Sequence, residues 1–208
     1  MKESEKEELE TFLKFFVEYY GYTINELADN YLFINNMIME ETLYFKRNGT
    51  YRHSTLKSVE EQVYKNEEYM TKYMCGLSIS DYIWAPHIKM LRYFEDSIKN
   101  IKGERYLEIG PGFGQYLLRA ISGGQFQEFL AVDLSETSVK KCRDYMAYRH
   151  IPMDACKIQN MDFFDFSSEE MFDCIVMGEV LEHVEAPLKM LEKIYDLLRG
   201  GVQHLSQQ

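Results

Sequence analysis

The turn that follows Tyr106 constrains this chain more than any other feature of its sequence. Residues 106–114 read Tyr-Leu-Glu-Ile-Gly-Pro-Gly-Phe-Gly, an apolar run that ends in three spaced glycines and opens a helical pattern. Glycines at such a turn let the backbone approach a ligand closely, and free N–H groups at a helix N-terminus favour electron-rich groups. Asp133 follows Gly114 by 19 residues, at the end of the next apolar run, where a carboxylate can accept hydrogen bonds from ribose hydroxyls. The spacing predicts a site for an adenosine-containing cofactor.

The charge beside this turn indicates which cofactor it suits. Dinucleotide sites use the spacing GxGxxG and leave a bare helix N-terminus for a pyrophosphate. Here the spacing is GxGxG, and Glu108 precedes it. A carboxylate would repel a pyrophosphate and attract an ammonium group. We therefore expect a positively charged ligand, and a nicotinamide-dependent dehydrogenase is the disfavoured alternative.

The hydrophobic period past Gly103 predicts an α/β fold. Short apolar runs alternate with helical patterns in the order βαβαββα, which is typical of a Rossmann-like parallel sheet. The expected strands are 105–109, 129–132, 155–158 and 172–177, and the expected helices are 116–121, 136–148 and 187–198.

The first 103 residues are expected to form a helical region, because their apolar residues recur at helical spacing. The expected breaks lie at Gly21, Asn48-Gly49, Cys75-Gly76 and Lys102-Gly103. Ser54 or Thr55 is expected to cap the third helix and Ser80 or Asp81 the fourth, with Pro86 as a kink or a late start. The chain thus divides into residues 1–103, for substrate binding or dimerisation, and residues 104–208, for the cofactor.

From residue 104 onward the sequence resembles the class I S-adenosylmethionine-dependent methyltransferases. The resemblance implies that the turn contacts the methionine part of S-adenosyl-L-methionine through Glu108, Gly110, Gly112 and Gly114. It also implies that Asp133 holds the ribose hydroxyls and that Leu134 lies on the adenine. Further positions in the cofactor site are implied for Asp162, Phe163 and Met177.

The segment after the fourth strand carries Glu-Val-Leu-Glu-His at 179–183, a signature common among small-molecule O- and N-methyltransferases. Methyl transfer from a sulfonium is an in-line displacement, so the protein mainly positions the acceptor and removes its proton where needed. We predict that His183 is a general base or an orienting group and that Glu179 lines the reaction centre. Helix-start or surface roles for Glu182 and His183 remain equally open.

A metal site is the less favoured interpretation of the same residues. The pattern Glu-x-x-Glu-His contributes to a Mg²⁺-type site in RNA 3′-end methyltransferases, which have a second histidine next to the first. Val184 occupies that place here, and hard divalent cations prefer more oxygen ligands. No metal is therefore expected.

The acceptor is expected to bind the helical half, where Tyr82 and Trp84 are predicted to line its pocket, although packing explains most aromatic residues of this region. The net charge is −11 and the pI is about 5.0, so the chain repels nucleic acids and anionic membranes. A neutral or cationic small molecule, or a peptide, is the expected partner. The four cysteines form no CxxC pair, and no segment is apolar enough to span a membrane, which predicts reduced thiols and a cytoplasmic protein.

The sheet is expected to be C-terminally truncated. The family's sheet has seven strands, whereas four are clear here, with at most a stub of a fifth around 202–205. Residues 174–177 would then form an apolar edge, which a homodimer could cover. Three interpretations compete: a fragment of a longer enzyme, a short chain completed by dimerisation, or a catalytically incomplete S-adenosylmethionine-binding or scaffold subunit.

Overall fold

A computed structural model describes residues 2–50, 67–152, 154–200 and 205–206 of the chain. The chain divides into two compact units, residues 1–89 and 90–208. This division falls within a helix, upstream of Gly103. The functional division after Gly103 stays a prediction.

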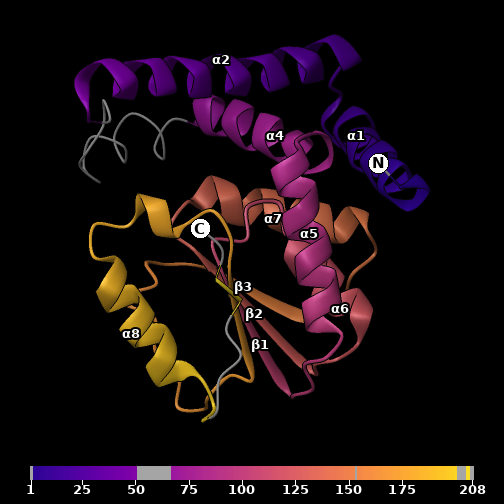
Figure 1. Cartoon of the computed structure of the whole chain (residues 1–208). Helices are drawn as coiled ribbons and strands as arrows, with labels where there is room; N and C mark the ends of the chain where they lie inside the picture. Colours follow the sequence, from indigo (N-terminus) through magenta and orange to yellow (C-terminus); the bar gives the residue numbers. More distant parts are fainter. Residues whose placement is uncertain (1, 51–66, 153, 201–204, 207–208) are drawn as a thin grey trace. The chain divides into compact units, whose positions relative to one another are not determined.

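The first unit is helical, as the sequence predicts (Figure 1). Its helices are α1 (Glu3–Tyr20), α2 (Ile24–Asn48), α4 (Glu67–Ile83) and the start of α5 (Ala85–Ile98). Gly21 and Gly49 end the first two helices with left-handed φ angles of 73° and 71°, which confirms both predicted breaks. Thr23 begins α2 with a capping box that it shares with Glu26.

The predicted break at Cys75-Gly76 is wrong, because α4 runs through it to Ile83. A Cβ atom on Gly76 would lie 2.3 Å from the Asn30 backbone oxygen and 2.5 Å from Ile34 Cγ1. The glycine therefore lets α4 pack closely on α2 and does not end a helix. The predicted caps for the third helix, Ser54 and Thr55, lie outside the described residues.

The predicted caps for the fourth helix are also wrong. Ser80 and Asp81 lie in the last turn of α4, where the Ser80 hydroxyl donates to the Leu77 carbonyl. Pro86 lies in the first turn of α5, which is the predicted late start. The helix ends at Ile98, a few residues before Gly103.

The second unit is a parallel α/β sheet in the predicted order (Figure 1). Its elements are β1 (Arg105–Ile109), α6 (Gln115–Gly123), β2 (Glu128–Asp133), α7 (Glu136–Tyr148), β3 (Cys156–Asn160), β4 (Cys174–Met177), a 3₁₀ turn (Leu181–His183), α8 (Pro187–Leu197) and β5 (Leu205–Ser206). The spatial strand order is β3-β2-β1-β4-β5. The order of connection reverses at β1, and in open parallel sheets ligands bind outside the carboxyl ends of the strands at such a point.

The two faces of the sheet have different surroundings. Leu107 and Ile109 of β1 are buried in one apolar core with Met190 and Ile194 of α8. Because side chains alternate along a strand, Tyr106 and Glu108 face the opposite side. Figure 1 shows α8 and α6 on opposite sides of the strands. Glu108, just before the glycine turn, therefore lies on the side away from the α8 core.

The predicted fifth strand is present, but the prediction of an unpaired β4 edge needs correction. β5 pairs in parallel with β4, with Leu205 opposite Val176 and Ser206 opposite Met177. The fifth strand described is only two residues long. It supplies backbone partners for the last two residues of β4.

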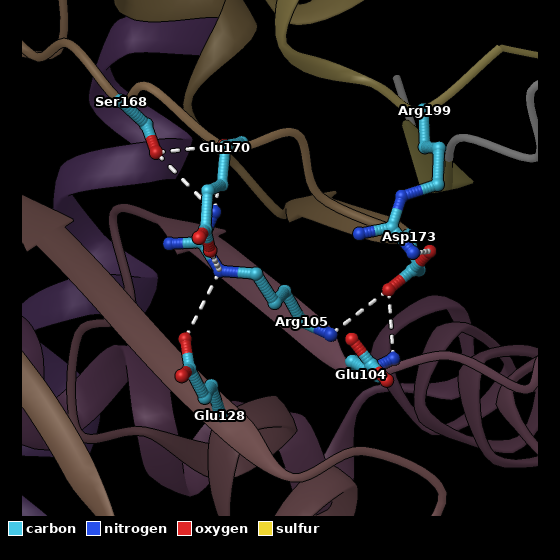
Figure 2. A network of polar contacts seen from close by, with 7 residues as sticks. All are labelled: Glu104, Arg105, Glu128, Ser168, Glu170, Asp173 and Arg199. Atoms are coloured by element: carbon cyan, nitrogen blue, oxygen red, sulfur yellow. Dashed lines mark hydrogen bonds and ion pairs between the residues drawn. The ribbon is translucent and has the colours of Figure 1, made fainter.

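A network of hydrogen bonds and ion pairs connects the amino end of β1 to neighbouring segments (Figure 2). The Asp173 carboxylate accepts hydrogen bonds from the N–H groups of Glu104 and Arg105, at 2.7 and 2.9 Å, and pairs with Arg199 at 3.0 Å. The Arg105 guanidinium reaches Glu128 of the neighbouring strand at 3.0 Å and lies 4.4 Å above the Phe172 ring. These contacts join β1 to β2 and to the segment before β4.

We expect Asp173→Ala to lower the free energy of unfolding by about 3 kcal/mol, because it leaves two backbone donors and a guanidinium without their acceptor. Urea unfolding measures the change. Glu170→Ala is the matched control, since its carboxylate is 73% exposed and lies 3.6 Å from Arg105. That control should change stability by less than about 0.5 kcal/mol. Equal losses in the two variants would contradict the proposed role of Asp173.

Candidate cofactor site

The glycine turn lies at the carboxyl end of β1 and has the backbone geometry that only glycine adopts easily. Gly110, Gly112 and Gly114 have φ angles of 67°, 57° and 80°. A Cβ atom on Gly114 would lie 2.8 Å from Cys142 Sγ and 2.8 Å from Met146 Cε of α7. Two of the three glycines also contact neighbouring segments closely, so substitution at Gly110 or Gly114 would displace side chains as well as strain the backbone.

Asp133 ends β2 beside this turn. Its Oδ1 accepts from the Ser135 N–H at 2.9 Å, and its Oδ2 accepts from the Ser138 hydroxyl at 2.6 Å. Burial raises the pKa of this carboxyl, and the two hydrogen bonds together with the nearby Gly112 N–H oppose the rise. The glycine turn and the start of α7 thus meet at one carboxylate.

Glu108 is almost completely buried, with 1% of its surface exposed. Its Oε2 accepts from the Tyr106 hydroxyl at 2.6 Å, and its Oε1 has no hydrogen-bond partner. Burial raises the pKa of this carboxyl from an ordinary 4.5 to about 8, opposed by the Tyr106 hydrogen bond and assisted by the charge of Asp133. Without a ligand the group is therefore mostly neutral at pH 7, which the sequence argument from a charged carboxylate did not foresee.

The segments after β2 and β3 lie together. Asn160 ends β3, and its Nδ2 donates to the carbonyls of Asp133 and Leu134 at 3.0 and 2.9 Å. The Leu134 side chain is 41% exposed, as a residue that covers a ligand ring would be. Asp162 accepts from the Phe164 N–H at 2.8 Å within its own loop.

Two of the residues implied by the resemblance are buried in the α8 core. Phe163 stacks on Phe166 with ring centroids 6.2 Å apart, and Met177 belongs to the same apolar core. Both are at most 4% exposed. Their side chains therefore support the site from within the core.

The loop after β4 packs against the glycine turn. A Cβ atom on Gly110 would lie 2.4 Å from Val180 Cγ2, and one on Gly178 would lie 2.8 Å from the Tyr116 ring of α6. Glu179, between Gly178 and Val180, has a left-handed φ of 54°. A residue with a side chain rarely adopts this conformation, and such residues cluster at functional sites. His183 is exposed at the end of the 3₁₀ turn.

The structure thus brings three of the predicted segments to one edge of the sheet: the glycine turn, Asp133 with Leu134, and the loop that carries Glu179. Tyr82 and Trp84 belong to the first unit. Tyr82 is 2% exposed and lies 6.0 Å from the Phe12 ring, which is a packing role. The Trp84 indole donates to the Tyr31 hydroxyl at 2.9 Å.

Two residues of the site were not predicted from the sequence. Tyr106 could have been found from strand alternation, which places it on the same face as Glu108. Ser138 is five residues after Asp133, in the first turn of a helix that Ser135 caps, and such a position can return a hydroxyl to the strand end.

Across 2–50, 67–152, 154–200 and 205–206, no group of three or more His, Cys, Asp and Glu side chains has an arrangement that could hold a metal ion. None of the helices described in those ranges has the length and apolar character to cross a membrane.

Comparisons with known proteins bear on this arrangement. Residues 107–203 match the sequence model of a methyltransferase domain family. No curated protein sequence matches the chain. A protein of Methanococcus maripaludis, described as an S-adenosyl-L-methionine-dependent methyltransferase, has 18% identity and a TM-score of 0.56 over 74% of this chain and 65% of its own.

Two further solved structures match a smaller part of the chain. The YcgJ protein of Bacillus subtilis has 19% identity and a TM-score of 0.48, over 54% of this chain and 47% of its own. An S-adenosylmethionine-dependent methyltransferase of Clostridium acetobutylicum has 16% identity and a TM-score of 0.48, over 59% of this chain and 52% of its own. The chain spans about half the length of these two proteins.

The family match covers the glycine turn, Asp133 and the loop after β4, and the Methanococcus structure shares the fold. Residues 107–203 of this chain therefore match the methyltransferase domain family and have the Rossmann-like fold of the class I S-adenosylmethionine-dependent methyltransferases.

Proposed function

We propose that this chain binds S-adenosyl-L-methionine at the carboxyl edge of its sheet and transfers the methyl group to a small molecule. The observation that carries the proposal is the position of the glycine turn and Asp133 at the carboxyl ends of two paired parallel strands, β1 and β2. The match of residues 107–203 to the methyltransferase domain family supports it.

In this proposal Asp133 accepts from the ribose, and the exposed Leu134 covers the adenine. Asp162 reaches the adenine edge from the loop after β3. Glu108 and the three glycines face the methionine part, whose ammonium group the Glu108 carboxylate can neutralise once it is ionised. Phe163 and Met177 support these segments from the core beneath them.

The methyl acceptor is proposed to be neutral or cationic, since the chain carries a net charge of −11. Bound S-adenosylmethionine would supply an activated methyl group, and the protein would orient the acceptor and take its proton. His183 is the proposed base, and Glu179, held in a left-handed conformation, is proposed to line the acceptor side.

A methyl-transfer assay over phenol, catechol, amine and small peptide acceptors tests the activity. Formation of S-adenosylhomocysteine that depends on one acceptor class supports the proposal. Cofactor binding without turnover on any acceptor would favour a cofactor-binding subunit.

His183→Ala is expected to lower turnover roughly 100-fold or more, because general-base catalysis contributes at least this much. Affinity for S-adenosylhomocysteine, measured by calorimetry, should stay within about twofold of the natural protein, since the proposed role concerns the acceptor. Unchanged turnover with intact cofactor binding would overturn the role of His183.

A further inference from the structure

The first turn of α7 contains a side chain, Ser138, that contacts Asp133, the proposed acceptor for the ribose. We infer that Ser138 is a positioning residue: its hydroxyl holds the Asp133 carboxylate in the orientation that receives a ribose hydroxyl. The inference rests on the proposed function and assigns a role to a residue outside the glycine turn.

Ser138 is fixed from two directions. It is 3% exposed, and its N–H donates to the Ser135 hydroxyl at 3.2 Å, which caps the helix. Its own hydroxyl donates to Asp133 Oδ2 at 2.6 Å, a short distance typical of a hydrogen bond to a charged acceptor. The helix backbone therefore determines where this hydroxyl lies, and the hydroxyl determines where the carboxylate oxygen lies.

The donors around Asp133 leave it little freedom. A carboxylate has about four lone-pair positions, and the Ser135 N–H and the Ser138 hydroxyl occupy two of them, one on each oxygen. The carboxylate is therefore oriented before a ligand arrives, with about two positions left for ribose hydroxyls. An acceptor that is already oriented loses less conformational entropy on binding.

The same hydrogen bond sets the pH range of binding. Donation from Ser138 favours the ionised carboxylate and so lowers the pKa of Asp133 against the effect of burial. The titratable neighbours that interact with this carboxyl are Glu108 of β1 and Cys142 of α7. Burial raises the pKa of the Cys142 thiol, which therefore stays neutral across the range of interest. Loss of the hydroxyl should move the acidic limit of cofactor binding to higher pH.

The test compares Ser138→Ala with Ser135→Ala by calorimetric titration of the full chain with S-adenosylhomocysteine between pH 5 and 9. Both serines are 3% exposed in α7 or its cap, but the Ser135 side chain accepts from Ser138 and its contact with Asp133 is made by the backbone N–H. Ser135→Ala thus removes a helix cap and keeps both donors to the carboxylate. Repeating the pair in a Glu108→Gln background removes the titration of the neighbouring acid.

Ser138→Ala is expected to weaken binding roughly three- to tenfold at pH 7.5, about the value of one hydrogen bond, and to shift the acidic limb to higher pH. Ser135→Ala should leave that limb in place. A uniform loss of affinity with no shift of the limb, or the same shift in both variants, would overturn the inference. Absence of binding by the natural protein would instead refute the proposed function, so the two failures are distinguishable.

Discussion

Asp133→Asn is expected to weaken binding of S-adenosylhomocysteine roughly 10- to 100-fold. The amide keeps the shape of the side chain but removes the charge that strengthens its hydrogen bonds to a ribose and to the two serine donors beside it. One of its two polar atoms also becomes a donor, which must face a donor of the site. Calorimetry of both proteins at pH 7.5 measures the effect.

Glu136→Gln is the matched control for this variant. Glu136 is an exposed acid in the first turn of α7, three residues after Asp133. Among the described residues, no contact joins it to the glycine turn. Its substitution should change the affinity less than about twofold. If the Asp133→Asn protein remains folded and binds the ligand as tightly as the control does, Asp133 is not part of the cofactor site.

Glu108→Gln is expected to have opposite effects on stability and on cofactor affinity. The pKa of Glu108 is about 8 in the folded protein, whereas an ordinary glutamate titrates near 4.5. At pH 7 the unfolded chain gains from ionisation and the folded chain does not, so the acid costs about 3 kcal/mol of stability. A glutamine can still accept from the Tyr106 hydroxyl and carries no such cost.

The pH dependence gives the sign of this effect. Below pH 4.5 both states hold the proton and the variant has no advantage. The advantage grows as the pH rises from 4.5 to about 8 and is then constant, because the folded acid also ionises. Urea unfolding at pH 4 and pH 7 measures it, with Glu104→Gln, an exposed acid just before β1, as the control. Equal stability of Glu108→Gln and the natural protein at pH 7 would contradict the buried neutral acid.

Affinity should change in the other direction. If the Glu108 carboxylate neutralises the ammonium group of the cofactor, Glu108→Gln weakens binding, and the affinity of the natural protein rises with pH toward about 8. A residue that lowers the free energy of unfolding and raises the affinity for the cofactor has its role in binding. A gain in stability with unchanged affinity would leave Glu108 without its proposed role.

Much of the sheet could be predicted because its signals are local. The order of strands and helices follows from the hydrophobic period, and the glycine turn needs only the sequence between Tyr106 and Gly114. Gly76 was misjudged because its role depends on α2, a distant segment whose backbone it must admit. A glycine that ends a helix and a glycine that admits a neighbour look the same in one sequence.

The position of the site could be predicted from the sequence, but the protonation state of Glu108 could not. The glycine turn and Asp133 come together because the carboxyl ends of neighbouring parallel strands share one edge. The neutral state of Glu108 depends on how completely the surrounding segments exclude water, which no spacing reports. Ser138 acts through Asp133, and its hydroxyl has no motif of its own.

Calorimetric titration of the full chain with S-adenosylmethionine, S-adenosylhomocysteine and NAD tests whether the carboxyl edge of the sheet is an S-adenosylmethionine site. We expect saturable binding of the first two ligands at one site, no binding of NAD, and binding that is roughly 10- to 100-fold weaker in Asp133→Asn. Binding of neither S-adenosyl ligand, or binding of NAD alone, would contradict it.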